Sequence, residues 1–214
     1  MEMEFSKIIK LSNLNDKDWS KILKDHQKEC AFNMKVRHKN LRLAKEVLES
    51  CNSKYWIIGG LLLGFYRDND FIPWDWDIDI DMFSENMRDS YDDLAQRFMD
   101  VGFIVRRNHQ FPDIKINLFR KKDRITIRGL FKDESGRYLM SKVDRYPIEF
   151  FQKTDYIEFQ GNRYPAPHPI KKYILYLYGK NWKKPIKDRK KLRADYYNRG
   201  VMRESYAKDI MHKM

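Results

Sequence analysis

Between Trp74 and Met82 the sequence alternates strictly between two kinds of side chain. Every second residue is an aspartate, and the residues between them are apolar or aromatic. Successive side chains of a β-strand point to opposite faces, so this period of two predicts a strand that has one face made only of carboxylates. On the other face we expect Trp76 in the core. The four carboxylates belong to Asp75, Asp77, Asp79 and Asp81.

Carboxylates on one strand face lie only ~7 Å apart and repel one another unless a cation lies among them. Mg²⁺ prefers hard oxygen ligands and keeps water and phosphate oxygens in its shell, so two or three carboxylates are enough to hold it. Two such ions about 4 Å apart would suit an in-line phosphoryl displacement. The competing interpretation is an edge strand whose carboxylates face water.

A second feature precedes this stretch. Gly59-Gly60 follows a short apolar run and precedes a predicted helix, an order that leaves free backbone N–H groups where a phosphate could approach. Arg67 lies two helical turns after Gly60 and on the same helix face, where a guanidinium could reach a phosphate. A plain turn would explain two glycines alone, but here the order strand, Gly-Gly, helix, arginine, acidic stretch supports an anion site.

The rest of the pattern predicts one α+β domain with a mixed sheet over residues 1–214. Its parts are an N-terminal helical segment (1–51), a core (52–165) and a basic helical segment (166–214). We expect one long helix or two shorter ones over Asp16–Ser50, helices over Leu61–Arg67, Ser84–Val101 and Ile170–Tyr178, the last closed by Gly179, and one further helix in Lys183–Met214. Strands are predicted at Tyr55–Ile58, Gly102–Val105, Ile114–Phe119, Arg124–Leu130 and Ile157–Phe159, the last four antiparallel, with prolines 165, 167 and 169 marking the exit from the sheet.

Charge is distributed unevenly along this chain. The formal net charge of +12 lies mainly in residues 171–214, whose net charge is +10, whereas Asp68–Asp93 holds ten acidic residues and one basic residue. A carboxylate cluster in a positive surround suits a metal-and-phosphate site better than nucleic acid binding. No apolar run approaches the ~20 residues of a transmembrane helix, and Cys30 and Cys51 form no zinc motif. We therefore expect a cytoplasmic protein, with the basic tail available for peripheral membrane contact.

Two blocks resemble the LicD/fukutin family. Gly59 to Arg67, followed by Phe71 to Asp79, is similar to that family's "GGTLLGxxR…IPWDxDxD" signature, and Tyr164 to Pro185 is similar to its later "PxP…YLxxxYGxxWxxP" stretch. The resemblance covers most of the chain. It implies a nucleotidyltransferase-like fold and a Mg²⁺- or Mn²⁺-dependent transfer of a phospho-alcohol (phosphocholine or ribitol phosphate) from a CDP-linked donor to a sugar hydroxyl of a glycan or glycolipid, with release of CMP.

The same resemblance assigns roles to six residues. Asp77 and Asp79 match the metal-binding pair, and Asp75 is the first aspartate of that motif; these three are the expected catalytic and metal-binding residues. Gly59, Gly60 and Arg67 match the turn and the arginine that hold the donor's phosphates.

The sequence departs from the family at two points. Leu61 stands where the family has Thr or Ser. The family also places a further carboxylate on a later strand, in a "hhDhF"-like context, and the comparable stretch here has Thr126 and Arg128 at the expected positions. Asp113 or Glu149 are candidates for that missing carboxylate, and an inactive protein is the other interpretation.

Three functions therefore remain. The first is a LicD-like phosphotransferase. The second is a nucleotidyltransferase that moves a nucleoside monophosphate from an NTP to a small molecule, protein or tRNA. The third is a catalytically degenerate basic module that binds an anionic polymer.

Overall fold

The computed structural model describes residues 5–13, 15, 18–19, 33–108 and 110–203. Among these described residues, the helices before the sheet are α1 (Phe5–Ser12) and α3 (Met34–Ser50). Asn33 caps α3, because its side chain accepts a hydrogen bond from the backbone N–H of Val36 at 3.1 Å. The predicted helix over Asp16–Ser50 is confirmed for its second half, whereas residues 20–32 lie outside the described residues.

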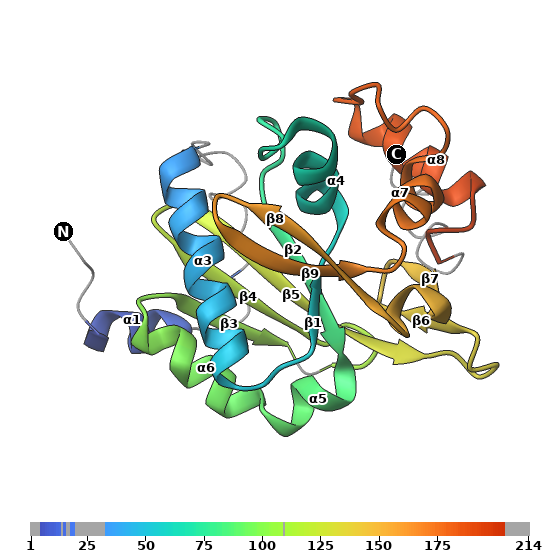
Figure 1. The fold of residues 1–214 in the computed structure, drawn as a ribbon. Coiled ribbons are helices and arrows are strands. Elements are labelled where there is room, and N and C mark those ends of the chain that lie inside the picture. The colour runs from blue at the N-terminus through green and yellow to red at the C-terminus, as the bar shows by residue number, and fades with distance from the viewer. Residues whose placement is uncertain (1–4, 14, 16–17, 20–32, 109, 204–214) are drawn as a thin grey trace.

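The main sheet has the strand order β1-β2-β5-β4-β3. Its strands are β1 (Tyr55–Ile57), β2 (Ile78–Phe83), β3 (Ile104–Asn108), β4 (Lys115–Arg120) and β5 (Asp123–Lys132). β2 and β5 run parallel, and the other neighbours are antiparallel. The far end of β5 pairs with β6 (Tyr138–Met140), which pairs with β7 (Arg145–Pro147). The α+β class with a mixed sheet is therefore confirmed (Figure 1).

The predicted acidic strand over Trp74–Met82 is wrong at its start. β2 begins at Ile78, and residues 74–77 form a turn and an extended loop outside the ladder. The reason is pairing: β5 contacts residues 78–83 and β1 contacts residues 80–82, so no neighbouring strand reaches the first half of the motif. Asp75 and Asp77 are thus loop residues, and Trp76 is half-buried instead of lying in the core.

The last strands form a sheet of their own, which corrects the predicted single antiparallel series. In the part of the chain that the structure describes, β8 (Thr154–Phe159) pairs only with β9 (Asn162–Pro167), and this two-stranded sheet follows a short 3-10 turn at Ile148–Phe151. Two of the prolines predicted to follow the sheet, Pro165 and Pro167, lie inside β9. A two-stranded sheet tolerates them because each of its strands has an edge without a partner.

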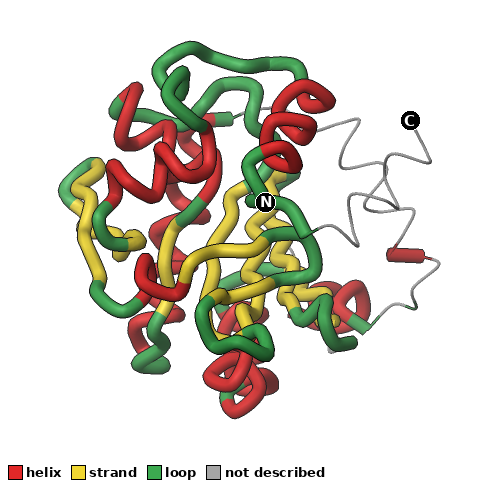
Figure 2. Tube along the Cα trace, turned by 90° about the vertical axis from the view of Figure 1, so that its right-hand side faces the viewer, coloured by secondary structure: helices red, strands yellow, loops and turns green. Residues whose placement is uncertain are grey.

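Five further helices surround the strands (Figure 2). They are α4 (Gly59–Asp68), α5 (Ser84–Asp89), α6 (Tyr91–Asp100), α7 (Ile170–Tyr178) and α8 (Arg189–Asn198). The single helix expected over Ser84–Val101 is two helices that meet at Ser90. The helix Ile170–Tyr178, with Gly179 in the positive-φ region at its end, is confirmed, and α8 confirms a helix in the tail.

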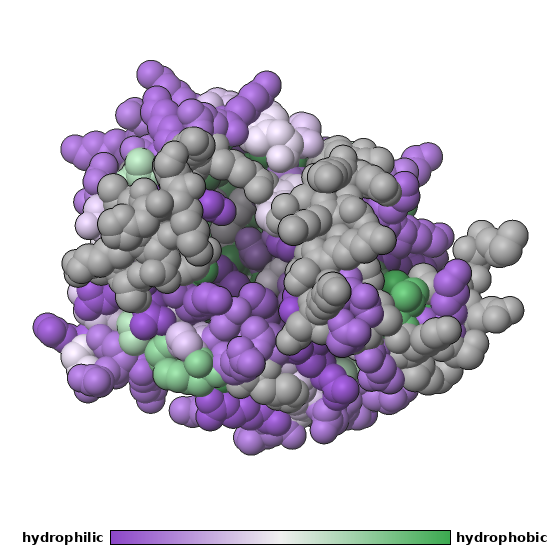
Figure 3. Space-filling view, turned by 180° about the vertical axis from the view of Figure 1, so that it is seen from behind, coloured by the Kyte–Doolittle hydropathy of each residue, from purple (hydrophilic) through white to green (hydrophobic). Residues whose placement is uncertain are grey.

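Beside a small separate cluster of Leu63, Ile72 and Ile174, the described residues form one large apolar core. It extends along the chain from Leu41 on α3 to Val201 after α8, with Trp56 of β1 fully buried near its centre. Hydrophilic side chains cover most of the described surface that Figure 3 shows from behind. Within the described part of the chain, no helix is both long and apolar enough to cross a membrane. The boundaries at 51/52 and 165/166 stay predictions.

Candidate functional site

The Gly59-Gly60 turn begins helix α4 directly after β1. Gly59 has φ +61°, a conformation that L side chains rarely adopt, so glycine is required there. A Cβ atom on Gly60 would lie 1.9 Å from Oδ2 of Asp75, and one on Gly59 would lie 3.5 Å from Oδ2 of Asp79. Two of the predicted carboxylates therefore lie directly against the glycine turn, close to the positive end of α4.

Asp77 has a different partner. It forms an ion pair with Arg124 of β5, whose guanidinium carbon lies 4.1 Å from the ring centroid of Trp76. Both charged side chains are about one-tenth exposed. The half-buried position of Trp76 therefore serves to cover this ion pair.

Asp81 is fully buried and is also paired with an arginine of β5. Arg128 lies beside it in the parallel register and donates from Nε to Oδ1 at 2.8 Å and from Nη2 to Oδ2 at 3.2 Å. Arg128 also forms an ion pair with Asp144 and donates to the hydroxyl of Tyr146 at 3.0 Å. The charge of the acidic motif is thus balanced in part by two arginines of the neighbouring strand, which the sequence argument did not consider.

A cavity of about 300 Å³ lies between α4, the acidic loop and the C-terminal segment. All six residues selected from the sequence line it: Gly59, Gly60, Arg67, Asp75, Asp77 and Asp79. Asp81 does not line this cavity; it lies behind Arg128 in the core. The structure therefore brings the predicted residues together, although two of them come from a loop.

The electrostatics of the cavity centre on Asp79. Burial raises the pKa of its carboxyl well above the ordinary value, and the neighbouring Asp77 carboxylate raises it further, while Arg128 opposes the shift. Among the described residues, no hydrogen-bond donor contacts the Asp79 carboxylate. A cation placed beside it would remove the cost of ionising this group.

The carboxylates do not form a closed metal cage. Within the described ranges, no three His, Cys, Asp or Glu side chains are arranged as a group that could hold a metal ion. Mg²⁺ does not need such a cage, because it binds through one or two carboxylates and completes its shell with water and phosphate oxygens. The Asp79 carboxylate, which has no donor among the described residues, fits that open kind of site.

Arg67 lies at the cavity with its side chain about one-tenth exposed. Its guanidinium is held by the next residue, since Nε and Nη2 donate to the two carboxylate oxygens of Asp68 at 2.8 and 2.6 Å. Nη1 donates to the backbone oxygen of Trp182 at 3.4 Å. Arg67 thus lies at the cavity, Asp68 occupies the bidentate face of its guanidinium, and its role in phosphate binding stays a prediction.

Sequence reasoning missed Asp144. The stretch Ile125–Phe131, where a further carboxylate was expected, is part of β5 and contains Arg128, while Arg124 lies directly before it on the same strand. Asp144, in the loop before β7, lines the same cavity as the acidic motif. Its sequence context, Val143-Asp144-Arg145-Tyr146, alternates apolar or aromatic and polar residues and was the signal available.

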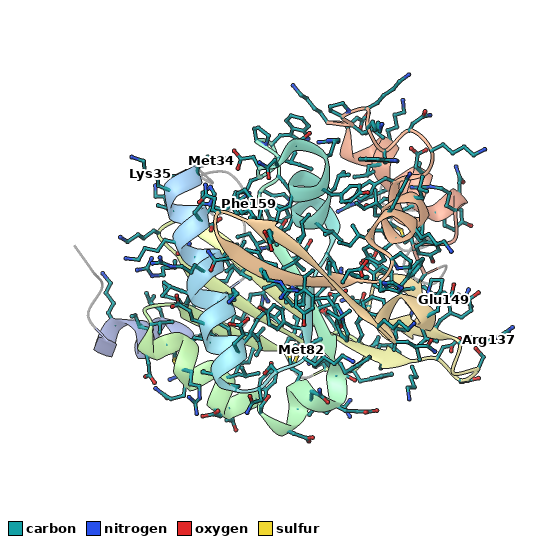
Figure 4. The ribbon with its side chains drawn as sticks, in the orientation of Figure 1. Met34, Lys35, Met82, Arg137, Glu149 and Phe159 are labelled. Atoms are coloured by element: carbon teal, nitrogen blue, oxygen red, sulfur yellow. The ribbon has the colours of Figure 1, made fainter. Side chains whose placement is uncertain are left out.

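The two candidates for that role lie elsewhere. Glu149 is exposed in the 3-10 turn after β7 (Figure 4) and lines neither of the two cavities that border the acidic motif. Asp113 is bound by Lys115 and Lys142 and borders a second cavity beyond Asp77 and Asp79. Leu61, which replaces the family's Thr or Ser, is buried.

The C-terminal segment forms the other wall of the first cavity. Its side chains there include the aromatic rings of Tyr178, Trp182 and Tyr196. Three cations border the same wall: Lys184, Lys187 and Arg193. The ammonium of Lys187 lies 4.9 Å from the ring centroid of Trp74, which is 39% exposed. Part of the basic tail therefore faces the acidic motif.

Comparison with known proteins gives a family match. The model of the family described as LicD/FKTN/FKRP, nucleotidyltransferase domain, matches residues 52–169. The match covers β1 to β9 and therefore includes the glycine turn, the acidic motif and Asp144.

Individual relatives are more distant. Human ribitol-5-phosphate transferase FKTN is 27% identical over 175 residues, which cover 77% of this chain and 37% of FKTN. Human ribitol 5-phosphate transferase FKRP is 37% identical over 54 residues, which cover 25% of this chain and 11% of FKRP. An uncharacterized protein of Rickettsia typhi is 28% identical over 128 residues, or 60% of this chain and 35% of that protein. This chain thus spans little more than a third of the length of FKTN.

A solved structure of a nucleotidyltransferase candidate from Thermotoga maritima has a TM-score of 0.45 to this chain and 18% identity. It covers 68% of this chain, and this chain covers 86% of it.

Proposed function

The chain belongs to the LicD/FKTN/FKRP family, and from that premise we propose that it transfers a phospho-alcohol from a CDP-activated donor to a hydroxyl of a glycan, releasing CMP. The names of FKTN and FKRP support the phospho-alcohol part, since both are ribitol-phosphate transferases. The observation that carries the proposal is the single cavity in which the acidic motif, the glycine turn and a basic wall meet.

The proposal includes a divalent cation, Mg²⁺ or Mn²⁺, at Asp75, Asp77 and Asp79, of which one or two carboxylates would bind it while water and phosphate oxygens complete its shell. The support is the Asp79 carboxylate, which has no hydrogen-bond donor among the described residues and whose pKa is raised, chiefly by desolvation. When bound, the cation would neutralise charge on the donor's phosphates. To bind the cation, the Asp77 carboxylate would have to leave its ion pair with Arg124.

The chain's own residues would bind and orient the donor. The glycine turn lets a diphosphate approach the backbone N–H groups of α4 without meeting a Cβ atom. The guanidinium of Arg67 would leave the Asp68 carboxylate and bind a phosphate instead, because a carboxylate and a phosphate can both accept two parallel hydrogen bonds from it. The aromatic side chains of the C-terminal wall give the nucleoside apolar surfaces to pack against.

The transfer step exchanges one oxygen–phosphorus bond for another. The acceptor hydroxyl forms a bond to the phosphorus of the alcohol phosphate, the bond from that phosphorus to the CMP oxygen breaks, and CMP leaves with the electron pair. The hydroxyl proton must go to a base. We assign this role to Asp144, the carboxylate of the cavity that lies outside the three-aspartate motif.

The test is CMP release by the purified chain. CDP-choline and CDP-ribitol would be incubated with Mg²⁺ or Mn²⁺ and a panel of glycans. Asp79→Asn should lower CMP release by at least about 100-fold, the range seen when one charge-stabilising group of an active site is removed, and Asp77→Asn should act in the same direction. The urea midpoint should show that both variants fold.

The matched control is Asp89→Asn, which removes an exposed carboxylate of α5 outside the cavity and should leave the rate unchanged. Undiminished CMP release by the double variant Asp77→Asn/Asp79→Asn would contradict the proposal. Pyrophosphate release from CTP or ATP would instead identify a nucleotidyltransferase that moves a nucleoside monophosphate.

A further inference from the structure

The acidic loop, residues 74–77, lies outside the strand ladder that fixes β2, so other contacts must hold it. The backbone oxygen of Asp75 accepts a hydrogen bond from Nη1 of Arg37 on α3 at 2.6 Å. We propose that Arg37 is a positioning residue, which holds the backbone at Asp75 so that the Asp75 and Asp77 carboxylates lie at the site. The effect on the reaction rests on the transferase function proposed above.

The Arg37 side chain contacts this region at two points. Besides its bond to Asp75, its guanidinium carbon lies 5.6 Å from the ring centroid of Phe71, which is buried just before the loop. Between these two contacts the chain turns, and the backbone N–H of Asp75 donates to the oxygen of Ile72 at 3.0 Å. One guanidinium therefore contacts the chain before and after this turn.

Arg37 is itself held by a carboxylate of the sheet. Its Nε and Nη2 atoms both lie 3.1 Å from Oδ1 of Asp123, the first residue of β5. Both side chains are less than one-tenth exposed. Because a guanidinium is planar and rigid, fixing its Nε and Nη2 edge at Asp123 also fixes the direction in which Nη1 points.

Asn40, one turn further along α3, completes this connection to the sheet. Its amide nitrogen donates to Oδ2 of Asp123 at 3.0 Å and to the backbone oxygen of Arg120 at 3.1 Å. Its amide oxygen accepts a hydrogen bond from Nη1 of Arg120 at 3.1 Å. Arg120 and Asp123 face each other at the end of the β4–β5 hairpin, so α3 is bound to the main sheet and the acidic loop is bound to α3.

A gain in stability does not explain a charged group at this position. Replacing a buried ion pair with apolar side chains is often neutral or stabilising. An apolar side chain at residue 37 would lack only the donor for the Asp75 oxygen. Residue 37 also lies outside residues 52–169, which the family model matches. The loop of the acidic motif is thus held by a helix that precedes the matched stretch.

The bond from Arg37 suits a loop that must bind a ligand. Another contact that holds the loop is the ion pair of Asp77 with Arg124, which Asp77 would have to leave to bind the cation. Arg37 contacts a backbone oxygen and occupies neither carboxylate of the loop. Its bond can therefore persist when the site is loaded, and it would keep the Asp75 carboxylate against Gly60.

The first test measures the loop directly and needs no substrate. Hydrogen–deuterium exchange followed by mass spectrometry would report on the backbone amides of residues 74–77. Arg37→Lys keeps the charge beside Asp123 but offers one nitrogen in place of three. We expect exchange in the loop to become about tenfold faster, the effect of losing one hydrogen bond from a charged group. Exchange in β2 and β5 should not change.

A second variant separates loss of the bond from loss of the fold. Arg37→Met alone would leave a buried carboxylate without its cation, a strongly destabilising change. Arg37→Met/Asp123→Asn removes both charges and keeps a side-chain oxygen for the Asn40 amide. Its urea midpoint should show that it folds, and exchange in the loop should still be faster. Arg42→Met, which replaces an exposed arginine of the same helix, is the matched control and should leave exchange unchanged.

The second test measures CMP release. Because a displacement of about 1 Å in a site can lower a rate about 100-fold, kcat should fall by about 10- to 100-fold in Arg37→Lys. The Mn²⁺ concentration that gives half the maximal rate should rise. The KM for the CDP-alcohol should stay nearly the same, because the glycine turn and Arg67 lie on α4. A smaller folded fraction would lower the rate without changing the Mn²⁺ requirement.

Unchanged exchange in residues 74–77 of both Arg37 variants would overturn the inference, and so would equal acceleration in Arg42→Met. Faster exchange together with an unchanged kcat and Mn²⁺ requirement would overturn the positioning role, while the transferase function would stand. If the parent chain releases no CMP from any donor, the transferase function fails. The exchange rates would then still decide whether Arg37 holds the loop.

Discussion

At Gly60 the absence of a side chain allows another residue to pack closely against the backbone of the site. The Asp75 carboxylate lies where a Cβ atom on residue 60 would be, at 1.9 Å, and this contact joins the start of α4 to the acidic loop. Alanine is ordinarily favoured over glycine within a helix by ~0.5–1 kcal/mol. At Gly60 the clash should outweigh that preference.

We expect Gly60→Ala to lower the free energy of unfolding by about 1–3 kcal/mol, the usual cost of overpacking. In an Asp75→Ala background the same substitution should be neutral or stabilising, because the clashing carboxylate is gone. Urea unfolding of the four members of this double-mutant cycle measures the difference. An equal loss of stability in both backgrounds would show that Asp75 is not the cause.

The two aspartates paired with arginine show what sequence alone could not provide at this scale. A charge pattern along one strand shows which of its side chains share a face. It does not show which side chains of the neighbouring strand lie beside them. Arg124 and Arg128 lie more than 40 residues further along the chain and meet Asp77 and Asp81 because β5 runs parallel to β2. Only the register between these two strands reveals the ion pairs.

Among the elements, those with a strong local signal could be predicted. Helix α7 has a clear apolar period and a glycine at its end, and its bounds match the prediction. Strand β2 was predicted too long, because residues 74–77 have the period of a strand but no neighbour to pair with. Strand pairing depends on residues far apart in the sequence, so the local alternation of side chains does not predict it.

One residue connects the small sheet to the C-terminal helix. Asp155 of β8 accepts a hydrogen bond from the backbone N–H of Ile170 at 3.0 Å, at the first turn of α7, and contacts Nδ1 of His168 at 2.7 Å. Burial opposes ionisation, but hydrogen bonds from His168 and Ile170 outweigh it and lower the pKa of Asp155. The carboxylate therefore stabilises the fold in its ionised form.

Asp155→Ala should lower the free energy of unfolding by about 1 kcal/mol at pH 6, the usual value of a helix-capping interaction. Because the folded-state pKa is lowered, this stability is present above the unfolded pKa of about 3.9 and is lost as the pH falls through the lower folded value. Urea unfolding between pH 6 and pH 3 should show the deficit shrinking below about pH 4. Glu158→Gln, an exposed change on the same strand, is the control, and a deficit independent of pH would contradict the assignment.

At the scale of the whole molecule, the cavity is built from two parts of the chain. One is the stretch that the family model matches, and the other is the segment after residue 169, which supplies the aromatic and cationic wall. The overall charge of +12 pointed to a polyanion, but only the fold shows that cations of the tail face the carboxylates. The sequence could identify both charge clusters, and their meeting depends on how α7 and α8 pack.

The end of the described chain is tied to the loop that carries Asp144. The backbone N–H of Arg145 donates to Val201, and that of Arg203 donates to Val143, both at 2.8 Å, so bonds on either side hold Asp144 in place. Val201 is fully buried, and Met202 borders the first cavity. Residues 201–203 therefore fix the position of a carboxylate to which we assign the proton-accepting role.

A chain that ends at Gly200 should lose about 2–3 kcal/mol of unfolding free energy, chiefly from the buried side chain of Val201. Its CMP release should fall more than its affinity for CMP, because Asp144 loses its support while the glycine turn is untouched. A chain that ends at Arg203 keeps every described contact and is the matched control. Urea midpoints, CMP release and CMP titration would be measured on both. Equal CMP release from the two truncated chains would contradict the role of residues 201–203, because the shorter chain then works without the backbone bonds that hold Asp144.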